Sequence, residues 1–142
     1  MEKVKLQAQY GLYINGQWRN ASDGATYNAE SPADGSHLAV CAQGSREDVE
    51  AASAAAWEAF KTWKKTTPAQ RATLLNKIAD IIDANKEHLA MVESMDNGKP
   101  IRETMNVDIP MAAEHFRYFA GCILAEAVSY THLRAHETLR HL

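Results

Sequence analysis

The sequence has few cysteines and no strong excess of charge of either sign. Only two cysteines occur among its 142 residues, Cys41 and Cys122, and they form no metal-binding or redox spacing. A disulfide-stapled scaffold is therefore excluded, and a reducing, cytoplasmic location is expected. Because the formal net charge is only −3, no general attraction to nucleic acid or to an anionic membrane is expected.

Long apolar runs are missing as well. No run is long enough to span a bilayer, and the N-terminus lacks the apolar core of a signal peptide. Hydrophobic residues make up 46% of the chain and charged residues 23%, which is ordinary for a soluble globular protein. The length suits one modest domain with its own core, and the chain has no internal repeat.

The first forty residues have the pattern of short strands joined by tight turns. Asn15-Gly16 lies between two short apolar or aromatic runs, which is the strongest short signal for a β-hairpin. Further strands are expected over residues 26–30 and 37–42. Cys41 has no basic neighbour in the sequence that would lower its pKa, so we interpret it as a small core residue rather than a nucleophile.

Two long helices are predicted next, each with a clear N-terminal signal. Ser45 is a good N-cap for the first helix, which is rich in alanine. Thr67 and Gln70 form a capping box at the start of the second. We interpret Trp57 and Trp63, on the first helix, as packing anchors.

Residues 95–126 organise the end of the chain. Asn97-Gly98 predicts a tight reversal, because both residues tolerate positive φ. Asp108 is predicted to cap a new helix that has Pro110 in its first turn. An apolar stripe follows at helical spacing, formed by Phe116, Phe119, Ala120, Ile123 and Leu124.

The amino-acid sequence of this stretch resembles that of the NAD(P)-dependent aldehyde dehydrogenases. The resemblance rests on DNGKPIRE at 96–103, DIP at 108–110 and HFRYFAGC at 115–122, with YINGQW at 13–18 in support. The run at 115–120 is most similar to the acetaldehyde dehydrogenase branch. The resemblance implies an α/β fold, namely the N-terminal part of the aldehyde dehydrogenase fold. In it, a short hairpin and strands precede about four helices of an incomplete cofactor-binding domain, which is mostly helical as it stands.

The resemblance also implies an activity whose reactive parts this chain lacks. Family members oxidise an aldehyde, here acetaldehyde, to a carboxylic acid with NAD or NADP. Their cysteine nucleophile lies in a G-Q-x-C context that neither Cys41 nor Cys122 matches. We predict no catalytic residue and no cofactor contact in this chain, which should be inactive alone. For the full-length protein we expect a small-molecule aldehyde as substrate and a homo-oligomeric state, without nucleic-acid or membrane partners.

One site of the family is expected to survive in part. Some members hold a structural monovalent cation, and its ligands resemble the Asp108 carboxylate and the backbone carbonyls around Ala29 and Glu30. Oxygen ligands of this kind suit such a cation. The simpler interpretation, favoured by the residues alone, is that Asp108 only caps a helix.

Three segments are expected: a flexible N-terminus at 1–10, the native portion at 11–127 and a non-native tail at 128–142. VSYTHLRAHET, at 128–138, resembles a translated sequencing adapter. His132 and His136 have the spacing of zinc ligands, but Leu133 stands where the metalloprotease motif needs glutamate. The chain up to residue 127 would then be the opening quarter of a longer enzyme.

A non-catalytic helical binding module is the alternative interpretation. It predicts a monodisperse species with a cooperative melting transition. The fragment interpretation predicts exposed apolar helix faces and aggregation, because in the family such faces cover a sheet built from later sequence.

Deleting residues 128–142 tests the tail assignment. If the tail is non-native, deletion should leave the far-ultraviolet circular dichroism per residue of the remaining fold unchanged, because that fold would not depend on the tail. Loss of stoichiometric zinc on deletion, measured by metal analysis, would contradict the assignment.

Overall fold

The computed structural model describes residues 4–138, with side chains described as far as Ala125. Five short strands come first: β1 (Gln9–Tyr10), β2 (Leu12–Ile14), β3 (Gln17–Arg19), β4 (Thr26–Glu30) and β5 (His37–Ala42). The helices follow: α1 (Arg46–Trp63), α2 (Pro68–Ala84), α3 (Lys86–Asn97), α4 (Ile101–Glu103), the π-helical turn η1 (Thr104–Asp108) and α5 (Ile109–Thr138). The predicted order of short strands before about four main helices is confirmed.

The strands form two small sheets. In the three-stranded sheet β5 is central, with β1 parallel to it on one side and β4 antiparallel on the other. The second sheet is the β2–β3 hairpin, in which Tyr13 pairs with Trp18. Its turn places Asn15 at φ 53° and Gly16 at φ 76°, as a two-residue turn with positive φ at both positions requires. The hairpin predicted from Asn-Gly is therefore confirmed.

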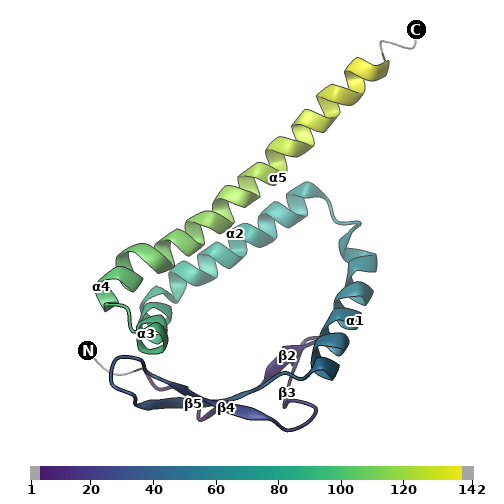
Figure 1. Ribbon diagram of the computed structural model, residues 1–142. Helices are drawn as coiled ribbons and strands as arrows, with labels where there is room; N and C mark the ends of the chain where they lie inside the picture. Colours follow the sequence, from purple (N-terminus) through teal and green to yellow (C-terminus); the bar gives the residue numbers. More distant parts are fainter. Residues whose placement is uncertain (1–3, 139–142) are drawn as a thin grey trace.

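The helices pack through small residues. α2 lies antiparallel along α5, as Figure 1 shows, while α3 packs beside η1. Ala72 and Ala79 of α2 are buried, as are Ala113 and Ala120 of α5. Small side chains let two helix backbones approach closely, so these alanines permit the pairing. At the side of this seam the Arg117 guanidinium bridges Asp80 and Asp83 at 2.8 and 2.7 Å, and the two carboxylates raise the pKa of Arg117.

The predicted helix starts at Ser45 and Thr67 are confirmed. Each residue accepts from a backbone N–H three positions on, and each has a reciprocal side-chain partner, Asp48 for the first and Gln70 for the second. Both capping boxes thus close helix ends that would otherwise carry free N–H groups.

The interpretation of Trp57 and Trp63 as packing anchors is wrong for this chain. Their exposures are 69% and 44%. In Figure 1 helix α1 stands apart from the α2–α5 pair. The hollow beside Trp57 is lined by residues of α1, so the Trp57 ring stays largely exposed. The Trp63 ring is partly covered by the Arg71 guanidinium, which lies 5.9 Å from the ring centre.

The predicted N-cap role of Asp108 is also wrong. The chain does not leave the helix before Asp108, because α4, η1 and α5 follow one another without an interruption. The Asp108 carboxylate instead accepts from the Lys99 ammonium at 2.8 Å. The wider π turn continues the helix through Asp108, where we expected a new helix to begin.

Substitution of Gly98 tests the turn between α3 and α4. Gly98 ends α3 with φ 76°, and an added Cβ would lie 3.0 Å from Pro32 Cγ. Gly35 has φ 69° with nothing within 4 Å. Gly35→Ala should therefore lower the free energy of unfolding by about 1–2 kcal/mol, the cost of a left-handed backbone. Gly98→Ala should cost more, because the Pro32 ring must also move; equal losses in urea unfolding would contradict this contact.

Candidate functional site

Asp108 lies at the junction of η1 and α5 with 19% of its side chain exposed. Its carboxylate pairs with Lys99, and this hydrogen bond raises the pKa of Lys99. Ile109, next in sequence, lines a hollow together with Ala29 of β4, so the predicted carboxylate and carbonyl ligands belong to neighbouring segments. The structure thus supplies a lysine ammonium as the cation beside Asp108. A metal ion bound by Asp108 and the carbonyls around Ala29 and Glu30 stays a prediction.

The hollow itself has a volume of about 390 Å³ and lies between the three-stranded sheet and α3. Its walls are mostly apolar, while Glu93 and Asp96 of α3 contribute carboxylates. The apolar lining residues include Leu6, Tyr10, Leu38, Leu89 and Val92. The cavity has the character of an incompletely filled core between a sheet and a helix.

Each cysteine has a tyrosine hydroxyl as its partner. Half-buried Cys41 faces Tyr27 and raises its pKa, chiefly through a hydrogen bond. Cys122, inside α5, raises the pKa of Tyr118 in the same way. A reactive thiolate is usually created by a nearby cation or by a helix N-terminus. A tyrosine hydroxyl supplies neither kind of positive charge.

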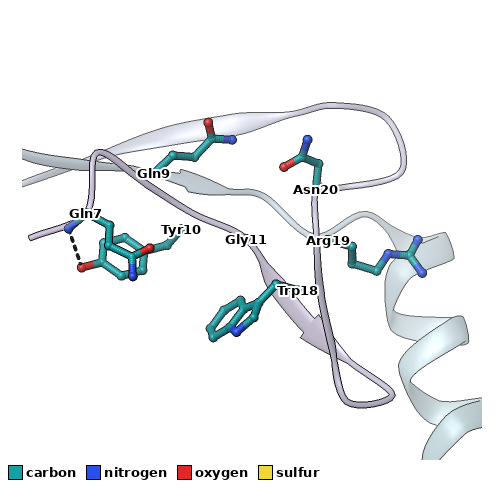
Figure 2. A pocket seen from close by; sticks show the side chains of 7 residues that line it. All are labelled: Gln7, Gln9, Tyr10, Gly11, Trp18, Arg19 and Asn20. Atoms are coloured by element: carbon teal, nitrogen blue, oxygen red, sulfur yellow. Dashed lines mark hydrogen bonds between the residues drawn. The ribbon is translucent and has the colours of Figure 1, made fainter.

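A second hollow, of about 510 Å³, separates the N-terminal segment from the hairpin (Figure 2). The Gln7 backbone N–H donates to the Tyr10 hydroxyl at 3.1 Å, while the Arg19 side chain extends away from Trp18 toward α1. The lining residues are Gln7, Gln9, Tyr10, Gly11, Trp18, Arg19 and Asn20. This set combines amides, aromatic rings and one guanidinium, and it contains no carboxylate, imidazole or thiol for acid–base or nucleophilic chemistry.

Asp48 forms a buried polar centre, and its side chain is only 2% exposed. One carboxylate oxygen, Oδ2, accepts from the backbone N–H and the hydroxyl of both Ser22 and Ser45, at 3.0–3.3 Å. The other, Oδ1, accepts from the Arg19 guanidinium at 3.1 Å. The backbone donors of Ser45 and then Ser22 contribute most to lowering the pKa of Asp48 to about 2.

The sequence analysis predicted Ser45 as an N-cap but did not identify Asp48 as part of a site. The spacing of Ser45 and Asp48 is a capping-box pattern, which could have been recognised. Arg19 and Ser22 lie 29 and 26 positions before Asp48, and no local pattern indicates these contacts. Their effect is to fasten the hairpin and the loop after it to the start of α1.

Side-chain caps occupy the N-termini of α1 and α2, where a dinucleotide phosphate could otherwise bind. Phosphate binding at a helix N-terminus needs free backbone N–H groups. Capping boxes close the N-termini of α1 and α2, and α3 begins directly after Asn85, the residue that also ends α2. That the cofactor contacts lie outside this chain stays a prediction.

Metal ligands are not clustered in the described side chains, which contain no group of three or more His, Cys, Asp or Glu residues placed to hold an ion. The side chains of His132 and His136 lie outside that described part. The backbone there continues α5 as far as Thr138.

Comparison with known proteins gives a consistent result. The model of the aldehyde dehydrogenase family matches residues 18–139. A long-chain-aldehyde dehydrogenase from Acinetobacter is 48% identical over 124 residues, which is 87% of this chain and 25% of that protein. Acetaldehyde dehydrogenase 2 from Cupriavidus necator is 45% identical over 118 residues, covering 83% of this chain and 23% of the relative.

Solved structures agree in fold. The crystal structure of PnpE in complex with nicotinamide adenine dinucleotide has a TM-score of 0.78 and 42% identity, over 80% of this chain and 23% of that one. The chain thus spans about a quarter of the length of the relatives it matches. The family match runs past residue 127, and a non-native origin of 128–142 stays a prediction.

Acid titration tests the Asp48 centre. The pKa of Asp48 is lowered from 3.8 to about 2, so the carboxylate stabilises the fold above pH 3.8 and this contribution is lost as pH falls toward 2. Asp48→Asn should lack this contribution at every pH, which would flatten the dependence of urea unfolding on pH in that window. Glu50→Gln is the control, because its exposed carboxylate only pairs with Arg46. An unchanged profile for Asp48→Asn would contradict the assignment.

Proposed function

The chain belongs to the aldehyde dehydrogenase family, and from this membership we propose that the full-length protein oxidises an aldehyde to a carboxylic acid with NAD or NADP as hydride acceptor. The family match over residues 18–139 is the observation that carries the proposal. The complex of PnpE with nicotinamide adenine dinucleotide supports the choice of cofactor class. Because this chain spans about a quarter of its relatives, the activity is assigned to the whole protein.

Acetaldehyde is the proposed substrate. The run at 115–120 and the 45% identity to acetaldehyde dehydrogenase 2 support it. The relative from Acinetobacter is named for long-chain aldehydes, so a longer substrate is the competing choice. A direct comparison of acetaldehyde with a long-chain aldehyde separates the two.

The part of the enzyme contained in this chain is scaffold. Its own residues hold the hairpin on α1 through Asp48 and pair α2 with α5. Each of the two thiols is paired with a tyrosine hydroxyl through a hydrogen bond. Capping boxes supply acceptors for backbone N–H groups at the starts of α1 and α2. A homo-oligomeric, cytoplasmic enzyme is proposed from the family alone. Among residues 4–138, no helix is long and apolar enough to cross a membrane.

A stand-alone helical module is the second candidate. The α2–α5 pair favours it, because buried alanines and the Arg117 ion pairs give these helices contacts that need no further chain. A sharply melting monomer of the 142-residue chain would support the module over the fragment.

An activity assay tests the proposed function. The 142-residue chain should form no NADH from acetaldehyde and NAD, because the nucleophile and the cofactor contacts are assigned to other segments. The full-length reading frame from the same source should form NADH under the same conditions. Turnover by the short chain that is abolished by Cys41→Ser or Cys122→Ser would overturn the proposal, as would an inactive full-length protein that is folded and binds NAD.

A further inference from the structure

The turn between α3 and α4 fixes the backbone of Lys99 at several points. Its N–H donates to Asn97 Oδ1 at 2.8 Å, and its carbonyl accepts from the Ser94 hydroxyl. Gly98, in the left-handed conformation, comes before Lys99. Pro100 comes after it and disfavours the helical conformation at Lys99. The Lys99 side chain therefore starts from a backbone whose position is already set.

The Lys99 ammonium pairs with the carboxylate of Asp108, nine positions later. Nζ lies 2.8 Å from Oδ2, and 19% of the Asp108 side chain is exposed, against 51% for Lys99. The carboxylate is thus mostly withdrawn from water, where an ion pair is screened less than at a fully exposed site. This pair closes the segment 99–108, which contains α4 and the π turn η1.

The charges of this segment balance without a metal ion. Residues 99–108 contain two cations, Lys99 and Arg102, and two carboxylates, Glu103 and Asp108. Arg102 pairs with Glu103 at 2.8 Å, so each cation has one carboxylate of the segment as its partner. A monovalent metal ion at Asp108 would lie beside the ammonium, and the repulsion between two positive charges at short distance opposes that arrangement.

The surroundings of Asp108 also disagree with the predicted set of metal ligands. The hollow that contains Ala29 is lined by Ile109, and Asp108 is not among its lining residues. Among the described side chains, no group of three or more His, Cys, Asp or Glu residues could hold an ion. The residues around Asp108 therefore fit an ammonium group better than a metal ion.

We propose that the Lys99 ammonium is the built-in cation of the junction between α4 and η1, and that it takes the place of a monovalent metal ion at Asp108. A lysine ammonium is a compact point charge with three donors, so it neutralises a carboxylate as a bound ion would. Because the chain itself carries this cation, the junction does not depend on the concentration of Na⁺ or K⁺. The inference concerns the fold of this chain and does not rest on the proposed function.

Exchange of the salt cation during urea unfolding tests the proposal. Replacing NaCl or KCl by tetramethylammonium chloride at equal ionic strength should shift the unfolding midpoint of the 142-residue chain and of Asp108→Asn by the same amount, because Asp108 binds no metal ion. A shift in the unsubstituted chain that Asp108→Asn abolishes would overturn the proposal.

Removal of the ammonium gives a second measurement. Lys99→Gln leaves the Asp108 carboxylate without its partner, so the midpoint should fall by about 0.5 M urea. Lys99→Arg keeps the positive charge and should restore most of this loss. Lys61→Gln is the control, since Lys61 pairs with Glu58 at an exposed site of α1. In the Asp108→Asn background Lys99→Gln should cost less, and an equal cost in both backgrounds would contradict the pairing.

Sodium-23 relaxation needs no unfolding transition and therefore applies even if a variant unfolds without a sharp midpoint. The relaxation rate of Na⁺ in the presence of the unsubstituted chain should equal the rate with Asp108→Asn. Glu50→Gln removes the same charge from an exposed site and serves as the control. A rate that falls with Asp108→Asn but not with Glu50→Gln would show that Asp108 holds a metal ion, and the proposal would be wrong.

Discussion

The close approach of α2 to α5 is the contact on which the helical part depends. It requires small side chains where the helices meet, and Ala72, Ala79, Ala113 and Ala120 supply them. The ion pairs of Arg117, on α5, with Asp80 and Asp83, on α2, link the two helices beside this contact. The segments α3, α4 and η1 connect the C-terminal end of α2 to the N-terminal end of α5 (Figure 1). Their position therefore follows from the same contact. The strand region is held separately, and Asp48 is its fastening to α1.

Local chemistry made much of this fold predictable. The Asn15-Gly16 turn, the two capping boxes and the left-handed Gly98 are each determined by residues a few positions apart. The two failures have non-local causes. Asp108 was expected to begin a helix, but its carboxylate goes to Lys99, nine positions earlier, and the π turn keeps the helix continuous. Trp57 was expected to be packed, but it is exposed. The helical spacing of apolar residues shows which side of a helix is apolar, and it does not show which element lies opposite that side.

The sequence contexts of Cys41 and Cys122 predict that neither is the family's nucleophile, and this stays a prediction. In the structure each thiol has a tyrosine hydroxyl as its partner. The Asp48 centre could be anticipated only from its local half. Its other half depends on the hairpin folding back to α1, which brings Arg19 and Ser22 to a carboxylate far along the chain.

The buried core of the described residues is made of small side chains, and the aromatic rings lie outside it. The buried apolar residues of the described chain are all alanines, and the largest fully buried side chains are Thr104 and Asp48. Alanine contributes little apolar area, whereas a buried aromatic side chain contributes much more. The large apolar side chains, Phe60 and Trp63 among them, are therefore still available for burial. Hydrophobic burial is the main favourable term in folding, so the described residues leave much of the apolar area of their large side chains unused.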